Sequence, residues 1–379
     1  MFDLRICFQR SALLLLAGAL CLGVAACASD DKGYLVALDD TSKVLKTSTV
    51  LAVTTRTPAD ASKPGEIFSG ERGWELRYLS LTLSMPPNRP VGSLPAHSEK
   101  PDPEKHIALV SSRELTQEQF KALLKTSPFS KKRALVFTHG FNTMFDDAVI
   151  RFAQIVEDTK FNGVPVLFSW PSRGSITDYG YDKDSANFSR DAMESVLQTL
   201  AREPNLGGVD IFAHSMGNWL TLETLRQVAI ANDTKTLNRL QSIVLAAPDV
   251  DMDVFRTQIA RLGLLKGKIM LFASRDDYAL RASRRLFGDK IRAGENTDIA
   301  QFKALGIEAH DLSDVKGGVG QNHGKIFADG ASIAQVGTAM MQGTTRAQAQ
   351  PGNPISSGIA VIGRSVSAVG DAITPGRRQ

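Results

Sequence analysis

The chain has 379 residues, of which 43% are hydrophobic and 22% are charged, so it is long enough to bury a full hydrophobic core. Its formal net charge of +4 is too small to indicate a nucleic-acid partner. All three cysteines, Cys7, Cys21 and Cys27, lie at the N-terminus, so the rest of the chain can form no disulfide. Composition thus excludes a disulfide-stapled fold and favours an ordinary globular protein.

The N-terminus has the pattern of a bacterial export signal. Arg5 and Arg10 precede an apolar run over residues 12–22, which is too short to span a bilayer comfortably. Val24-Ala25-Ala26-Cys27 resembles the lipobox of bacterial lipoproteins, which predicts a signal peptide over residues 1–26 and a lipidated Cys27. The alternative is a plain secretory leader cleaved near Ala26. By the same resemblance, Ala28 favours a lipid-anchored protein of the cell envelope, on the outer membrane facing the periplasm.

Residues 27–48 are polar and predict a tether between this anchor and a folded domain over residues 49–342. The N-terminal part of the domain, residues 49–130, predicts strands at 49–54, 74–83 and 106–111 and a helix at 114–125.

The second part of the domain, residues 131–342, alternates between apolar strands and amphipathic helices. Strands are expected at 134–138, 164–169, 209–213, 242–246, 268–273 and 307–312. Helices are expected at 146–160, 185–202, 218–229, 253–262 and 280–286, with a last helix after His323. This order predicts an α/β fold, with a mostly parallel central sheet covered by helices on both faces.

The C-terminal segment, residues 343–379, is rich in Gly, Ala, Ser and Pro and predicts a flexible tail. It also contains an apolar stripe at helical spacing, which favours an amphipathic helix that forms only against a partner surface. The stripe consists of Ile355, Ile359, Ile362, Val366, Val369 and Ile373.

The segment Ala213-His214-Ser215-Met216-Gly217 joins an apolar strand to a helix. A serine on such a strand-to-helix turn is lifted above the sheet and faces a helix N-terminus, which makes Ser215 the candidate nucleophile. Ala213 stands where glycine is more usual. The alternative is a serine that only caps a helix after a buried strand.

An oxyanion produced by attack on a carbonyl needs preorganised N–H donors. In this kind of fold they come from the residue after the nucleophile and from an earlier loop at a strand end. We therefore assign the backbone N–H groups of Phe141 and Met216 to this role. His139, at the same strand end as Phe141, is interpreted as a structural residue.

A serine nucleophile needs a histidine base, and the base needs a buried carboxylate. Asp277, which follows the strand at 268–273, is the preferred acid, and Asp249 is the alternative because it follows the preceding strand. His323 lies in a glycine-rich turn before a helix and is preferred as base over His310, which lies within a strand. The order Ser215, Asp277, His323 is typical of α/β-hydrolases.

Residues 49–330 resemble a bacterial α/β-hydrolase family of unknown function that is described as esterase-like or lipase-like. The resemblance rests on segments 137–142, 168–172, 213–218, 246–251 and 273–280. It implies an α/β-hydrolase fold and a serine hydrolase. The predicted reaction is cleavage of a carboxylic ester, of a small molecule or a lipid, through an acyl-enzyme at Ser215. This chemistry requires no metal and no organic cofactor. The alternative function is a non-catalytic envelope protein that keeps the fold as a binding module.

Overall fold

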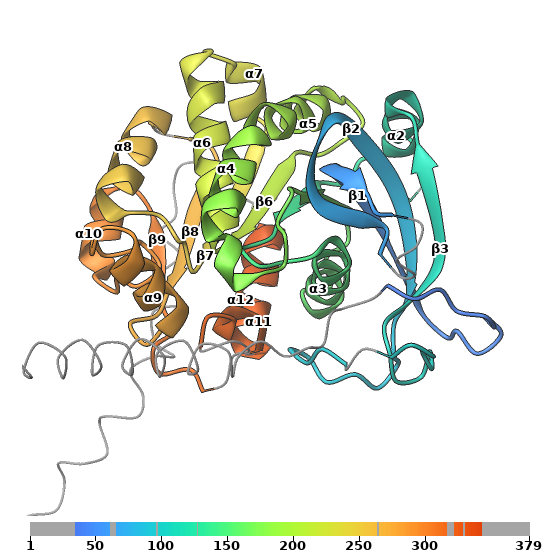
Figure 1. The fold of residues 1–379 in the computed structure, drawn as a ribbon. Coiled ribbons are helices and arrows are strands. Elements are labelled where there is room, and N and C mark those ends of the chain that lie inside the picture. Colours follow the sequence, from blue (N-terminus) through green and yellow to red (C-terminus); the bar gives the residue numbers. More distant parts are fainter. Residues whose placement is uncertain are drawn as a thin grey trace, which may run out of the picture. The chain divides into compact units, whose positions relative to one another are not determined.

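The computed structural model describes residues 35–60, 66–95, 98–126, 128–263, 265–316, 322–328 and 330–342 (Figure 1). One nine-stranded sheet forms the centre, in the order β3-β2-β1-β5-β4-β6-β7-β8-β9. Its strands are β1 (Thr47–Pro58), β2 (Phe68–Ser84), β3 (Ala108–Leu115), β4 (Ala134–Thr138), β5 (Val164–Ser169), β6 (Val209–His214), β7 (Leu240–Ala246), β8 (Lys268–Ala273) and β9 (Glu308–Asp311).

Seven neighbouring strands, from β1 to β9, run parallel. At the centre, Val136 of β4 is paired with Val166 of β5 on one side and Ile211 of β6 on the other. All residues of β4 and β5 are buried, as expected for strands covered on both faces. The mostly parallel sheet predicted from the sequence is confirmed.

Helices lie on both faces of the sheet (Figure 1). One apolar layer includes Met193, Leu220 and Phe255, and the other includes Phe145 and Phe152. The helices are α2 (Gln117–Leu124), α3 (Phe145–Asp158), η1 (Ile176–Asp178), α4 (Tyr179–Phe188), α5 (Arg190–Arg202), α6 (Met216–Ile230), α7 (Thr234–Leu237), α8 (Met252–Leu262), α9 (Tyr278–Leu286), α10 (Ile299–Ala304), α11 (Lys325–Ala328) and α12 (Gly330–Gln342).

The expected helix at 114–125 was wrong at its start, because β3 extends to Leu115. In this strand Arg113 and Glu114 are exposed and pair with Ser80 and Leu79 of β2. The helix begins only at Gln117, after Thr116 caps it through a bond from the Gln119 N–H. The polar end of this edge strand has the composition of a first helical turn, which explains the difference.

The expected single helix at 185–202 is two helices, α4 and α5, which meet at Ser189. The Ser189 hydroxyl donates to the Ser185 carbonyl and is also 2.8 Å from the Thr55 hydroxyl of β1. A bond to a distant strand therefore accompanies the break, and α4 begins six residues earlier than expected.

The expected tether does not extend to residue 48. Leu35 is buried, and residues 36 and 38 form backbone hydrogen bonds with Leu109 of β3 at 3.0 and 2.9 Å. The chain thus joins the folded domain about a dozen residues before β1.

Chain contacts divide the protein into two units, residues 1–344 and 345–379. The elements above belong to the first unit, whereas the signal segment, Cys27 and the apolar stripe of the tail lie outside the described residues. Of the helices in the described part of the chain, none is long and apolar enough to cross a membrane.

Candidate active site

Ser215 occupies the turn between β6 and α6 in a conformation that side chains rarely adopt. Its φ of 52° and ψ of −121° lie outside the regions favoured by residues other than glycine. The turn is fixed by backbone bonds: Ser215 N–H donates to Ala246 O at 3.0 Å, and Ser215 O accepts from the N–H groups of Asn218 and Asp249. Strain of this kind persists where the surroundings hold it, and it is common at active sites.

The loop after β4 lies directly against this serine. A methyl group at Gly140 would come within 2.9 Å of Ser215 Cβ, and one at Gly217 would come within 2.5 Å of His139 O. Both glycines are therefore required for the close approach of loop and turn. Phe141 follows Gly140, and Met216 opens α6, so the two predicted oxyanion donors belong to segments that flank Ser215. Ala213 is fully buried in β6.

Asp277 follows β8 and His323 follows the adjacent parallel strand β9, 46 residues further along the chain. Asp277 Oδ2 lies 2.7 Å from His323 Nδ1, and Asp277 Oδ1 accepts from Leu280 N–H at 3.0 Å, which caps α9. Burial disfavours the charged imidazole, yet the Asp277 carboxylate raises the pKa of His323 above its ordinary value. Asp277 is 1% exposed. The predicted base thus has a buried carboxylate partner.

His323 is connected to the serine turn through His214. The two imidazole rings lie 4.8 Å apart, and His214 Nε2 is 3.4 Å from His323 O. Among the described residues, no hydrogen bond joins Ser215 Oγ to the His323 ring, and such bonds commonly tighten only in complexes with substrate. Burial lowers the pKa of His214 well below its usual range, so this ring is neutral.

Asp276 holds the segment that carries His323. The Lys325 ammonium donates to both Asp276 oxygens at 2.7 and 2.8 Å and to the carbonyls of Leu312 and Ser313. Asn322 Nδ2 also donates to Asp276 Oδ2, at 3.1 Å. The neighbours of His323 on both sides are therefore tied to the residue that precedes Asp277.

A buried arginine, Arg56 of β1, supports the loop that approaches Ser215. Its guanidinium donates to Ser169 Oγ at 2.9 Å, to Ser172 O at 2.8 Å and to Thr143 O at 2.8 Å. Burial, together with this cation, lowers the pKa of His139 to about 3. His139 is therefore neutral and unsuited to act as a base, in agreement with the structural role expected for it.

Asp182 and Trp170 complete this support. Asp182 Oδ2 accepts from Asn142 N–H at 3.2 Å and from the Ser172 hydroxyl, which in turn accepts from Thr143 N–H at 3.0 Å. The Trp170 ring stacks on His139 and donates to the His139 carbonyl at 3.0 Å. Trp170 is fully buried, so it packs beneath the loop and does not line an open acyl pocket.

Asp249, the alternative acid, is engaged elsewhere. Its two oxygens accept from the hydroxyls of Tyr179 at 2.9 Å and Ser283 at 2.8 Å, and Arg292 Nε lies 3.4 Å away. The structure therefore brings Asp277, and not Asp249, into hydrogen-bond contact with His323. His310, the alternative base, stacks on Phe272 and pairs with Glu308 of β9.

Tyr179 forms an aromatic wall beside the site. Its ring packs edge-on against Phe141 at 5.2 Å and stacks on Phe287 at 4.1 Å. Tyr181 makes different contacts. Its hydroxyl donates to Gly70 O, and the Arg173 guanidinium lies over its ring in a cation–π contact. Of these two tyrosines, Tyr179 is thus the one that packs beside Phe141.

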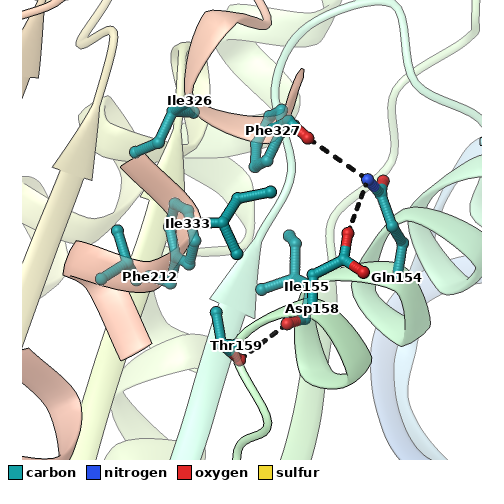
Figure 2. Close-up of a pocket in the computed structure, with 9 residues that line it drawn as sticks. Gln154, Ile155, Asp158, Thr159, Phe212, Ile326, Phe327 and Ile333 are labelled. Atoms are coloured by element: carbon teal, nitrogen blue, oxygen red, sulfur yellow. Dashed lines mark hydrogen bonds between the residues drawn. The ribbon is translucent and has the colours of Figure 1, made fainter. Parts of the chain in front are cut away.

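A small cavity lies behind the site, between α3, β6, α11 and α12 (Figure 2). Gln154 Nε2 donates to Phe327 O at 3.3 Å and to Asp158 Oδ2 at 3.1 Å, which fastens α11 to α3. The cavity has a volume of about 10 Å³, enough for roughly one water molecule. It cannot hold an ester substrate. Among the described residues, no group of three or more His, Cys, Asp or Glu side chains is placed to hold a metal ion.

Residues 112–340 match the family described as alpha/beta hydrolase of unknown function (DUF900). The chain belongs to this family. The match covers more than half of the chain and confirms both the resemblance and the fold class inferred from the sequence. This α/β hydrolase is therefore placed in a family whose reaction is undefined.

Other relatives are distant. An uncharacterized protein of Nostoc sp. (strain PCC 7120) is 27% identical over 124 residues, which are 26% of this chain and 32% of that protein. The match therefore spans about a third of the relative's length.

Similar solved structures include esterases and a dienelactone hydrolase. A hyperthermophilic esterase of Pyrobaculum calidifontis is 12% identical, covering 81% of this chain and 85% of its own, with a TM-score of 0.36. A structure from a study of two fungal esterases of Rhizomucor miehei is 11% identical, covering 86% of this chain and 89% of its own, with a TM-score of 0.37. A dienelactone hydrolase of Anabaena variabilis is 11% identical, covering 73% of this chain and 95% of its own, with a TM-score of 0.35. At these identities and TM-scores, they support no statement about activity.

Proposed function

We propose that this α/β hydrolase is a serine esterase that cleaves a carboxylic ester, of a small molecule or a lipid, through an acyl-enzyme at Ser215. The observation that carries the proposal is the 2.7 Å hydrogen bond between Asp277 and His323, found in the same structure as a strained serine turn at Ser215. A serine that only capped a helix would need neither feature.

In the proposed first step, Ser215 Oγ attacks the ester carbonyl carbon while His323 accepts the serine proton. The carbonyl π bond breaks, and its electrons become an oxyanion that the N–H groups of Phe141 and Met216 stabilise. Buried Asp277 fixes the imidazole tautomer and stabilises the imidazolium. Asp277 meets this requirement because it contacts Nδ1, which leaves Nε2 of His323 free to exchange the proton.

Collapse of the intermediate expels the alcohol, which takes the proton from His323 and leaves an acyl group on Ser215. Water then attacks the acyl carbonyl with His323 as base, releasing the acid and restoring the serine. The loop at Phe141 must stay fixed through both steps, and the bonds from Arg56 and Asp182 supply that rigidity.

The proposal is tested with a fluorophosphonate probe and with p-nitrophenyl esters of graded acyl length. We expect labelling and ester cleavage in the wild type and loss of both in Ser215→Ala. Ser242→Ala is the matched control, because Ser242 is also buried but lies at the opposite end of the adjacent strand β7. Folded wild-type protein with no Ser215-dependent labelling would contradict the proposal and favour the non-catalytic binding module.

The location proposed from the sequence is the cell envelope, with a lipid anchor at Cys27 on the outer membrane facing the periplasm. It is supported by the lipobox alone. It makes a membrane surface the setting in which the esterase would work.

A further inference from the structure

Exposed apolar side chains gather in one segment close to the candidate site. Of the ten large exposed hydrophobic residues in the described part of the chain, five lie within residues 278–299. Four of them belong to α9 and the loop after it: Tyr278 and Ile291 are each 51% exposed, Leu286 is 74% exposed and Phe287 is 42% exposed. Soluble proteins carry single exposed apolar residues routinely, but a cluster of this kind marks a contact surface.

The same segment is strongly basic. Residues 278–292 contain five Arg or Lys residues and one acidic residue, Asp289. Leu280 and Ser283 mark the buried face of α9, so Tyr278, Arg281 and Arg285, spaced by three and four, share its outer face. Arg285 is exposed and has no ion-pair partner among the described residues.

Lys290 extends this basic surface into the loop after α9. Its nearest acidic partner is Asp253 at 3.4 Å, and both side chains are more than 60% exposed. Such an exposed pair is weak, so Lys290 remains able to contact an anion. We call the surface formed by Tyr278, Arg281, Arg285, Leu286, Phe287, Lys290 and Ile291 the α9 lip.

The α9 lip is continuous with the candidate site. Asp277 caps the first turn of α9, directly before Tyr278. At the other end, Phe287 stacks on Tyr179, which packs against Phe141 of the oxyanion segment. In Figure 1, α9 and α11 both lie at the lower end of the strands. A surface seated on the α9 lip would therefore lie beside the reacting groups.

We propose that the α9 lip docks on an anionic phospholipid surface. Apolar side chains beside exposed basic side chains match the interface of such a bilayer. The apolar side chains enter the acyl boundary, and the basic side chains meet phosphate groups. A neutral protein partner would account for the apolar residues but not for the basic excess. The inference concerns binding and does not depend on hydrolysis.

The experiment measures partitioning of the full chain onto vesicles by sedimentation. All proteins carry Cys27→Ser, so that no acyl chain is attached, and Ser215→Ala, so that no lipid is consumed. We expect partitioning onto phosphatidylglycerol vesicles at least tenfold stronger than onto phosphatidylcholine vesicles, and weakening as salt rises. Arg285→Glu with Leu286→Ser should reduce the phosphatidylglycerol binding by about tenfold or more.

The matched control is Arg261→Glu with Leu45→Ser. Arg261 is an exposed arginine in the last turn of α8, as Arg285 is in α9, and Leu45 is 74% exposed, as Leu286 is. The control pair should bind vesicles within twofold of the parent, and thermal unfolding should show that every variant is folded. The proposal is overturned if the two double variants bind phosphatidylglycerol vesicles equally. It is also overturned if the Arg285 and Leu286 changes abolish only self-association of the protein. Absence of ester cleavage in protein that retains Ser215 would refute the proposed function, but it would not affect the vesicle-binding result.

Discussion

Replacing Asp277 by asparagine tests the site most sharply, because it removes one charge and keeps the shape of the side chain. The carboxylate is 1% exposed and lies 2.7 Å from His323 Nδ1. At an effective dielectric constant of about 20, a unit charge pair at this separation is worth about 6 kcal/mol. This corresponds to about four orders of magnitude in rate. An amide can also donate to Nδ1 and so favour the wrong tautomer.

The assay is kcat for a p-nitrophenyl ester, and the matched control is Asp249→Asn. Asp249 is also buried, at 6% exposure, but its carboxylate accepts hydrogen bonds from the hydroxyls of Tyr179 and Ser283. We expect Asp277→Asn to lower kcat by about 10⁴, and Asp249→Asn to lower the melting temperature while kcat stays within about tenfold. The assignment of the acid is refuted if folded Asp277→Asn keeps kcat within tenfold of the wild type. It is also refuted if only the Asp249 variant loses activity.

Four further outcomes are expected. The rate of ester cleavage should rise with pH through an apparent pKa above 6.5, because His323 acts as a base only when neutral and Asp277 raises its pKa. In Asp277→Asn the midpoint of this pH profile should move to lower pH. The ion pair should stabilise the fold below pH 6.5, and this contribution should be lost as pH rises through the raised pKa, which melting curves check. Gly140→Ala should abolish cleavage by displacing Ser215, whereas Gly180→Ala, with open space around it, should leave kcat within twofold. Palmitate labelling and globomycin-sensitive processing should depend on Cys27, and their persistence in Cys27→Ser would contradict the anchor.

The sequence predicted the sheet well where strands are buried on both faces. Such strands are continuous apolar runs, as in β4 and β5. Ser215 directly follows the end of β6, and Asp277 lies shortly after the end of β8. At β3 the pattern failed, because an edge strand tolerates polar residues such as Arg113. A signal for the true helix start was present: Thr116 and Gln119 have the spacing of a capping box, and both of its bonds are formed.

The supports of the site were not predictable from one sequence. Arg56 acts on Thr143, which is 87 residues away, and Lys325 acts on Asp276, which is 49 residues away. Nothing in the local pattern of either cation distinguishes it from an ordinary surface residue. Their roles follow only from the topology, which places β1 beside β5 and the His323 segment beside the end of β8.

The early attachment of Leu35 to the domain limits how far an anchored molecule can reach. Only seven residues lie between Cys27 and Leu35, which is buried and is the eighth residue after the cysteine. Even if fully extended, a chain segment of this length spans at most about 29 Å, which is no more than the thickness of a bilayer's hydrocarbon core. A chain lipidated at Cys27 would thus be confined to the face of its own membrane. Its substrates would have to reside in that membrane or diffuse to it.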